Sequence, residues 1–470
     1  MKIAKATPFE GKPMINMPSV FGGCKGKEIL CRIPVTGKRP IQLEAEGLAE
    51  GLVLENGMIK GTVQEDYEFP VKITAENELG TTTMEVRFKI HEDYMLQTPL
   101  MGFTSWNAFS NTVSQQLMEE TAEYILEEGI ADYGYRYMNI DSGWQSREYG
   151  GEYDAIMPNE KFPDMKGFCD KMHAMGFKCG IYSTPMLNAW GGVPNIPGCT
   201  RGEPDIMFTC QNGGVGVEHL EENNAKQWEE WGFDYLKYDW QPCDTFNADL
   251  MKKALLRRNR EMAFCVTVDA KYHFGKYWQK NCTSWRCNRD SLDDWEIVKG
   301  YMNTVMGWKD FVLPGHYYDL DMLEIGAMKW NQGKTRINEN EAIFAYTMRA
   351  FFLSPIQISC CVKDLSEFEK DLLCNEEMIQ INQDSLSDYP VPVDETEGKT
   401  VSIYKRTLEN GDLAIAIFNA SDEETTETIA LEGRSKVRNL WAKEDLQIAA
   451  GADSFTYTVE PHCALVFRIC

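Results

Sequence analysis

The chain has 470 residues, of which 43% are hydrophobic and 11% aromatic, and its formal net charge is −25. This length accommodates a large domain of roughly 250 residues together with smaller ones, rather than one domain alone. The negative charge argues against nucleic acid or an anionic membrane as a partner and favours a neutral small substrate, and no window approaches the roughly 18 consecutive apolar residues of a membrane span.

The amino terminus contains Lys2 and Lys5 but no apolar run after them, so it does not resemble a secretory signal. We therefore expect a cytoplasmic protein, although a secreted protein trimmed of its leader would look the same. The fifteen cysteines are an odd number without the CxxC spacing of zinc sites. We expect most of them to be reduced thiols in the core, and leave open whether any of them pair.

Residues 1–95 predict a small β-sandwich. Short β-like runs alternate with turn residues, and the period-two pattern of residues 83–90 is typical of a half-buried strand. The expected strands are residues 27–34, 42–46, 51–54, 70–75 and 82–90.

Residues 96–387 predict a (β/α)8 barrel. Apolar strand-like runs alternate with helical stretches such as 114–128 and 217–231, which indicates repeated β-α units and a parallel sheet. Eight runs are candidate strands, the number that a closed barrel needs. They are residues 102–106, 137–141, 178–182, 235–239, 264–268, 284–286, 311–315 and 355–359.

A second β-rich segment ends the chain. Residues 384–399 are rich in Pro, Asp and Ser and lack helical periodicity, so they predict a linker. Residues 388–470 then form a predicted antiparallel β-sandwich. Its expected strands are residues 401–406, 413–420, 425–431 and 464–468.

Polar side chains end nearly every predicted barrel strand, and the carboxyl ends of these strands are where a barrel builds its active site. They are Trp106 and Asn107, Asp141 and Ser142, Tyr182 and Ser183, Lys237 and Asp239, Arg286 and Asp290, and Asp319 and Asp321.

These strand ends carry a resemblance to a known family. Residues 98–107 (TPLMGFTSWN) resemble the first barrel strand of glycoside hydrolase family 27, the α-galactosidases and α-N-acetylgalactosaminidases. Further motifs follow in the family's order: 134–144 (GYRYMNIDSGW), 176–183 (GFKCGIYS), 231–239 (WGFDYLKYD), 285–290 (Trp285, Arg286 and Asp290), 319–323 (DLDML) and 379–384 (IQINQD). The resemblance runs from about Pro99 to the end and implies a retaining glycosidase that releases terminal α-linked galactose or a galactose-like sugar. Upstream, residues 61–90 resemble the immunoglobulin-like modules often fused to bacterial glycosidases.

A retaining glycosidase needs two carboxylates, one ionised to attack the anomeric carbon and one protonated to donate to the leaving oxygen, about 5 to 5.5 Å apart. The resemblance implies that Asp239 is the nucleophile and Asp290 the acid and base. Lys237 points to the same strand face as Asp239 and should favour its ionised form. A like charge and partial desolvation predict a raised pKa for Asp290.

Two neighbouring carboxylates, Asp293 and Asp294, lie close enough in the sequence to compete for the second role. The spacing from Asp290 to Trp295 matches the family and favours Asp290.

Substrate-binding roles are predicted for a further set of residues. Arg286 would donate a fork of hydrogen bonds to sugar hydroxyls, Trp106 and Tyr182 would form apolar walls, and Asp141 resembles a family ligand of the outer hydroxyls. Asp321 is either a support for these groups or purely structural. The complete predicted set is Trp106, Asp141, Ser142, Tyr182, Lys237, Asp269 and Arg286.

Three departures leave the sugar open. Ser142 stands where the family commonly has a second aspartate, and Gln241 stands in place of a cysteine, which argues against the family's disulfide. The fifth-strand loop, residues 268–273, matches neither the galactose nor the N-acetylgalactosamine pattern. Lys271 and Arg289 bring positive charge to the expected pocket. The alternatives are an α-N-acetylgalactosaminide, a β-L-arabinopyranoside, or a modified or anionic galactoside.

Two other classes of protein compete. A noncatalytic sugar-binding barrel is disfavoured because both carboxylates, Lys237 and Arg286 are present. A metal-dependent barrel could use Asp319 and Asp321, but the six histidines show no HxH or HExxH arrangement. We therefore expect no metal and no cofactor, and a carbohydrate as the partner. Whether the chain forms a homo-oligomer stays open.

Overall fold

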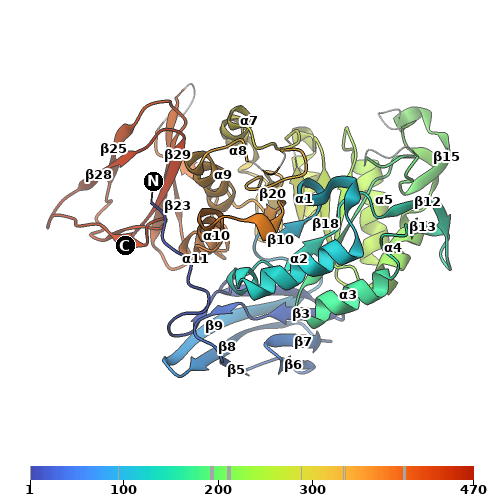
Figure 1. Cartoon of the computed structure of the whole chain (residues 1–470), viewed down its shortest axis with the longest axis horizontal. Helices are drawn as coiled ribbons and strands as arrows, with labels where there is room; N and C mark the ends of the chain where they lie inside the picture. The colour runs from blue at the N-terminus through green and yellow to red at the C-terminus, as the bar shows by residue number, and fades with distance from the viewer. Residues whose placement is uncertain are drawn as a thin grey trace.

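The computed structural model describes residues 2–93, 95–190, 195–208, 213–286, 288–331, 333, 335–394 and 399–470. A central sheet of parallel strands is wrapped by helices. Strands of the N-terminal region lie below it in Figure 1, and the C-terminal β-sandwich lies beside it.

The central sheet is an eight-stranded parallel (β/α)8 barrel, with strand order β20-β19-β18-β17-β14-β11-β10-β21. The two ends of this order meet through a parallel bridge between Leu323 and Ile358. The barrel strands are β10 (Met101–Thr104), β11 (Tyr137–Asn139), β14 (Lys178–Ser183), β17 (Tyr235–Asp239), β18 (Ala263–Thr267), β19 (Ser284–Arg286), β20 (Tyr317–Asp319) and β21 (Ile356–Ile358).

Helices between the strands bury one face against this sheet. In α2, the Ser114 side chain accepts a hydrogen bond from the Leu117 amide as the N-cap, and Met118, Ala122 and Ile125 recur at helical spacing on the buried face. The helices are α1 (Trp106–Phe109), α2 (Gln115–Glu127), α3 (Met165–Ala174), α4 (Glu221–Trp231), α5 (Thr245–Leu256), α6 (Gly275–Asn281), α7 (Trp295–Gly300), α8 (Met302–Val305), α9 (Glu339–Phe351), α10 (Glu367–Leu373) and α11 (Glu376–Asn382).

Two sequence predictions in the barrel need correction. Strand β16 (Gly216–His219), paired with β15 (Thr200–Pro204), occupies the beginning of the helix predicted at 217–231. The seventh strand predicted at 311–315 is wrong, because the strand is β20 and begins at Tyr317. Phe311 is buried by packing against Tyr272 and Trp308, not by strand pairing. Its segment therefore has the apolar pattern of a strand without being one.

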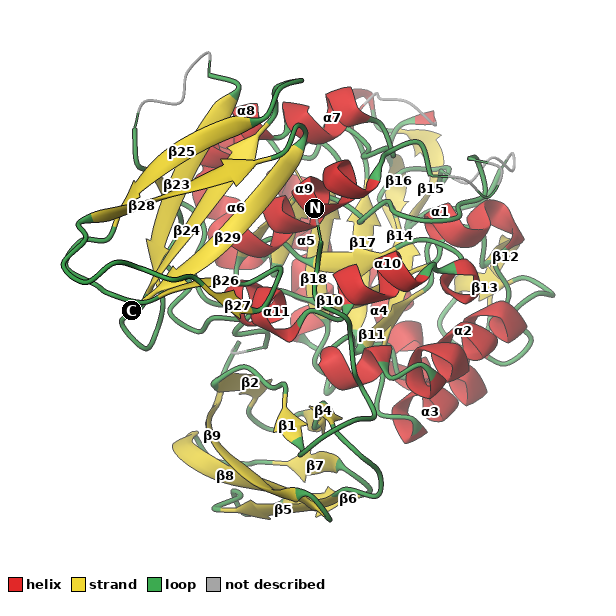
Figure 2. Ribbon diagram, turned by 60° about the vertical axis from the view of Figure 1, so that its left-hand side comes forward, coloured by secondary structure: helices red, strands yellow, loops and turns green. Residues whose placement is uncertain are grey.

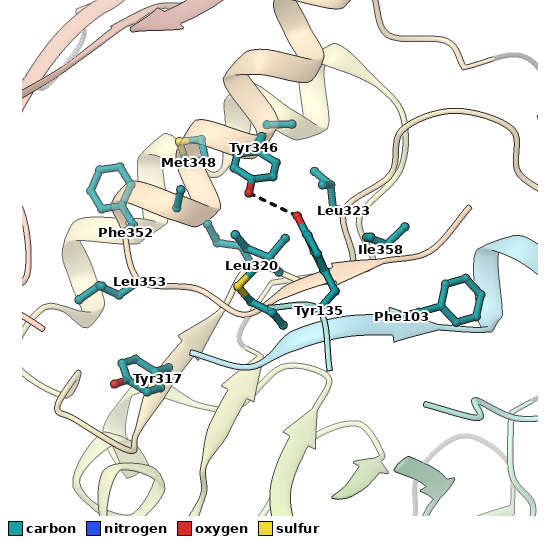
Figure 3. Close-up of a cluster of buried hydrophobic side chains, with 14 of the residues drawn as sticks. Phe103, Tyr135, Tyr317, Leu320, Leu323, Tyr346, Met348, Phe352, Leu353 and Ile358 are labelled. Carbon is teal, nitrogen blue, oxygen red and sulfur yellow. Dashed lines mark hydrogen bonds between the residues drawn. The ribbon is translucent and has the colours of Figure 1, made fainter. Parts of the chain in front are cut away.

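Helix α9 lies between the barrel and the C-terminal sandwich. Figure 3 shows its side chains Tyr346 and Met348 above the barrel residues Leu323 and Ile358. The hydroxyls of Tyr346 and Tyr135 lie 3.3 Å apart. One continuous core therefore runs from the barrel through α9.

The C-terminal sandwich pairs a six-stranded sheet, β22-β23-β24-β29-β26-β27, with a two-stranded one, β25-β28. Trp441 is fully buried, and its indole nitrogen donates to Thr347 Oγ1 of α9 at 3.0 Å. The strands are β22 (Val391–Pro392), β23 (Val401–Thr407), β24 (Leu413–Asn419), β25 (Thr425–Ala430), β26 (Val437–Asn439), β27 (Glu444–Asp445), β28 (Ser454–Val459) and β29 (Cys463–Ile469).

The N-terminal strands form a four-stranded sheet, β2-β9-β8-β5, a three-stranded sheet, β3-β7-β6, and the pair β1-β4. Buried apolar side chains from these sheets share one cluster. The similarity to an immunoglobulin-like module stays a prediction. The strands are β1 (Met14–Ile15), β2 (Val20–Cys24), β3 (Glu28–Arg32), β4 (Val35–Thr36), β5 (Gln42–Glu46), β6 (Leu52–Glu55), β7 (Met58–Thr62), β8 (Tyr67–Asn77) and β9 (Gly80–His91).

These N-terminal strands cover the amino ends of the barrel strands (Figures 1 and 2). Cys24 of β2 shares a buried cluster with Tyr137, Tyr235 and Ala263, the first residues of β11, β17 and β18. The carboxyl ends, where a barrel binds its ligands, stay uncovered by this region. No helix within the described ranges is long and apolar enough to cross a membrane.

Candidate active site

A cavity of about 660 Å³ opens at the carboxyl ends of the barrel strands. The side chains around it come from the ends of β10, β11, β14, β17, β18, β19 and β20 and from the loops that follow. They are Trp106, Asn107, Asp141, Ser142, Tyr182, Trp190, Lys237, Asp239, Gln241, Val268, Arg286, Asp290, Ser291, Leu292, Met322 and Trp330. All but one of the predicted site residues are therefore brought together, and Asp269 is the exception.

Asp239 is the last residue of β17 and is partly buried in the cavity wall. Strand alternation places Lys237 on the same face, and the Lys237 ammonium lies 2.7 Å from Asp141 Oδ2. Burial raises the pKa of the Asp239 carboxyl to about 6, while the positive charges of Lys237 and Arg286 partly oppose this rise. Asp239 is therefore ionised at neutral pH, as a nucleophile must be.

Arg286, the last residue of β19, connects two carboxylates. Its Nη2 lies 2.5 Å from Asp290 Oδ1, and its Nη1 lies 2.7 Å from Asp321 Oδ2. The Arg286 side chain is 4% exposed and that of Asp290 is 80% exposed. The predicted desolvation of Asp290 is thus wrong, because this carboxylate sits at the mouth of the cavity and contacts a cation.

The two competitors of Asp290 are occupied elsewhere. Asp293 is completely buried and accepts hydrogen bonds from the Arg336 amide and guanidinium at 2.7 to 2.9 Å and from Asn331 Nδ2 at 3.1 Å. Asp294 caps α7 by accepting from the Glu296 amide. Asp290 is therefore the carboxylate of this segment that reaches the cavity.

Asp321 supports Arg286. Its Oδ2 also accepts the Ser291 amide at 2.7 Å, and the Asp321 amide donates to Asp319 Oδ1 at 2.8 Å. Burial raises the pKa of Asp319 to about 6. The question left open for Asp321 is thereby answered: it fixes the arginine that holds Asp290.

Asp319 and Asp321, the candidate ligands of a metal-dependent barrel, do not suit a metal ion. Arg286 and backbone amides already contact their carboxylate oxygens. Elsewhere in the described part, His173, Cys179 and Asp234 come within ligand distance of one another. Asp234 is already bound there to Arg260 at 2.7 Å and to His173 at 2.8 Å. This group lies outside the cavity lining and is an ion-pair cluster.

Ser142 does not offer a simple hydroxyl to a ligand. Its Oγ donates to the backbone carbonyl of Trp190, and its amide donates to Asp141 Oδ1 at 2.7 Å. Trp190 belongs to the segment between β14 and β15, and sequence reasoning missed it. The sequence feature that could have indicated Trp190 is a single tryptophan in a connection that lacks strand or helix periodicity.

The fifth-strand loop differs from the prediction. Val268 lines the cavity, whereas Asp269 pairs with Lys271 and does not line it. Arg289 is exposed and is likewise not among the lining residues. The expected positive charge therefore lies outside the cavity wall, because a carboxylate two residues away holds the lysine.

Two carboxylates line a single barrel cavity: Asp239, at the end of β17, lies in the wall near two cations, and Asp290, in the segment after β19, lies at the mouth. This is the equipment that glycosidic bond cleavage requires, and the protein is a glycosidase. The comparisons narrow this class. Residues 98–201 and 204–384 match the family model described as alpha galactosidase A, and residues 398–469 match the alpha galactosidase C-terminal β-sandwich domain. The chain belongs to this family, glycoside hydrolase family 27.

Individual relatives agree with this assignment. The chain is 28% identical over 390 residues to an α-galactosidase of Oryza sativa subsp. japonica, covering 80% of this chain and 85% of that one. It is 28% identical over 351 residues to α-galactosidase A of Cellvibrio japonicus, covering 70% and 78%.

Among solved structures, a Bacteroides fragilis protein, itself only provisionally assigned as an α-galactosidase or melibiase, has a TM-score of 0.88 and 28% identity over 99% of both chains. A β-L-arabinopyranosidase of Geobacillus stearothermophilus has a TM-score of 0.70 and 23% identity over 79% of this chain and 97% of that one, which shows a shared fold.

Proposed function

We propose that this glycosidase cleaves terminal α-linked galactose, or a galactose-like sugar, with retention of anomeric configuration. The observation that carries the proposal is the position of Asp239 in the cavity wall beside two cations, with Asp290 in the same cavity. The family membership supports the same substrate class.

In the first step, Asp239 attacks the anomeric carbon while Asp290 gives its proton to the leaving oxygen, and a covalent glycosyl-aspartate forms. In the second step, Asp290 removes a proton from water, which attacks the same carbon and restores Asp239. Trp106 and Tyr182 supply apolar surface for the sugar, and Asp141 with Lys237 binds its outer hydroxyls.

A second candidate substrate is a β-L-arabinopyranoside, which has the ring of a galactoside without its hydroxymethyl group. The observation that favours it is Ser142, whose hydroxyl already donates to the Trp190 carbonyl. Asp141 is then the single carboxylate at this strand end, so fewer outer hydroxyls can be bound. An α-N-acetylgalactosaminide or a modified galactoside are weaker alternatives.

A panel of nitrophenyl glycosides separates these candidates, with the α-galactoside, the α-N-acetylgalactosaminide and the β-L-arabinopyranoside compared by kcat/KM. Proton NMR of the first-formed sugar then tests the mechanism. We expect the product to keep the anomeric configuration of the substrate. An inverted product would remove Asp239 from the nucleophile role, and no turnover of any member would leave a noncatalytic sugar-binding barrel.

A further inference from the structure

Arg349, near the end of α9, is 1% exposed and lies behind the active-site cavity rather than in its wall. Its guanidinium donates to the carbonyls of three successive residues after β20. Nη2 lies 3.2 Å from the Leu320 oxygen and 2.5 Å from the Met322 oxygen, and Nε lies 3.1 Å from the Asp321 oxygen. Nη1 donates back to Ala345 of α9 at 3.0 Å. These partners are carbonyls, not a carboxylate, so the contacts order the backbone rather than neutralise a charge.

The backbone that Arg349 holds is a tight turn. Successive carbonyls of an extended strand point in opposite directions, so three of them reach one guanidinium only where the chain curls around it. The middle residue, Asp321, has a φ of 70°, a left-handed conformation that costs energy for a residue other than glycine. Such a conformation persists where surrounding contacts hold it, and Arg349 supplies these contacts. Arg349 therefore determines the direction in which the Asp321 side chain leaves the turn.

From this turn, contacts lead directly to the candidate general acid. Asp321 Oδ2 lies 2.7 Å from Arg286 Nη1, and Arg286 Nη2 lies 2.5 Å from Asp290 Oδ1. Arg349 Nη2 also donates to Ser291 Oγ at 3.5 Å, and Ser291 directly follows Asp290. The Asp290 side chain is 80% exposed, so little packing holds it in place. Its position depends on the neighbours that Arg349 contacts.

We propose that Arg349 is a positioning residue for proton donation by Asp290, acting through Asp321 and Arg286. Helix α9 also accepts the hydrogen bond from Trp441 of the C-terminal sandwich at Thr347. Arg349 thus connects the helix on which the sandwich rests to the mouth of the cavity. The inference rests on the proposed function and adds to it a residue outside the cavity on which the general acid depends.

The experiment compares two substrates that carry the glycosyl group selected by the nitrophenyl panel. One is the methyl glycoside, whose leaving oxygen needs a proton, and the other is the glycosyl fluoride, whose leaving group needs little acid assistance. Arg349→Met keeps an apolar stem without donors and should lower kcat/KM for the methyl glycoside about tenfold more than for the fluoride. Arg349→Lys keeps the charge but not the fork of donors, and the difference should be about threefold.

The ratio of the two kcat/KM values separates positioning from stability. A smaller folded fraction lowers both rates by the same factor and leaves the ratio unchanged. If Arg349→Met does not fold, Arg349→Lys alone decides the test. Arg406→Met is the matched control, because it removes another buried arginine that donates to α9, at the Phe351 carbonyl, and that lies outside the cavity lining. This control should keep the wild-type ratio even where it lowers stability.

A double variant tests whether the effect passes through Asp290. In Asp290→Ala no acid is left to position, so adding Arg349→Lys should not change the ratio further. A wild-type ratio in the Arg349 variants that fold, or a further fall of the ratio in the Asp290→Ala background, would overturn the positioning role and leave the proposed function intact. If the wild-type protein cleaves no glycoside of the panel, the proposed function fails, and the positioning inference fails with it.

Discussion

Lys237 Nζ lies 2.7 Å from Asp141 Oδ2, so the lysine charge nearest the candidate nucleophile is shared with a second carboxylate. Lys237 lowers the pKa of Asp239, and Asp141 raises it. Burial is the largest influence and leaves the Asp239 pKa at about 6, above its ordinary value of 3.8. Two predictions follow from the direction of this shift.

The first concerns activity. Asp239 must be ionised to attack, so kcat/KM on a reactive nitrophenyl glycoside should fall tenfold per pH unit below about pH 6. The measurement is a pH profile of kcat/KM, which reports groups of the free enzyme. An acid limb that begins only near pH 4 would contradict the assignment of this titration to Asp239.

The second concerns stability. Because the folded-state pKa of Asp239 is raised, its favourable contribution is present below about pH 4 and is lost as pH rises through about 6. Because Asp239→Asn cannot ionise at this position, the variant should unfold at a higher urea concentration than wild type at pH 8. Its free energy of unfolding should be higher by at most about 3 kcal/mol. The difference should vanish near pH 4, while turnover is abolished at every pH. Glu367→Gln, at a carboxylate that is 92% exposed, is the control and should shift little at either pH.

A third prediction concerns the guanidinium that joins Asp290 to Asp321. Arg286→Lys leaves one ammonium for two carboxylates, and the buried Asp321 loses a close partner. We expect kcat/KM to fall about ten- to a hundredfold and the free energy of unfolding to fall by about 1–3 kcal/mol. Arg289→Lys changes an exposed arginine three residues later and serves as the control. Wild-type kcat/KM in Arg286→Lys would show that Asp290 needs no such support.

The fourth prediction reverses an expectation from the sequence. A carboxylate at position 142, as in the family, is expected from the sequence to improve binding of plain galactose. However, Ser142 donates its hydroxyl hydrogen to the Trp190 carbonyl. An ionised aspartate has no hydrogen to donate, so its carboxylate oxygen would repel the carbonyl oxygen of Trp190. Ser142→Asp should therefore lower kcat/KM on a nitrophenyl α-galactoside, and by more than Ser142→Ala, which only removes the donor. A gain in Ser142→Asp would mean that the Trp190 segment moves aside.

Much of the barrel could be predicted because its strands are short apolar runs that end in polar residues. This pattern, with the family motifs, located Asp239, Asp290, Lys237 and Arg286, and the structure brings all four to one cavity. The seventh strand was misplaced because Phe311 is buried by aromatic neighbours, which apolar periodicity cannot distinguish from strand pairing.

The parts of the site that the sequence did not reveal come from connections. Trp190 and Trp330 reach the cavity through loops whose path depends on distant partners such as Asn107 and Asp293. The predicted site role of Asp269 was wrong for the opposite reason, because a local partner, Lys271, forms an ion pair with its carboxylate. Strand ends are fixed by the pattern of the chain itself, whereas loop side chains are placed by contacts that only the folded molecule defines.

The N-terminal strands contact the barrel where β11, β17 and β18 begin, and Arg32 and Arg39 both bind the buried Asp132 there. A chain that began at residue 96 would expose Tyr137, Tyr235 and Ala263 to water as one apolar patch. Such a patch favours self-association, whereas the cavity at the far end would be unaltered. In protein engineering, changes to the N-terminal region should therefore alter self-association and solubility. Changes in sugar selectivity must be made at the other end of the barrel.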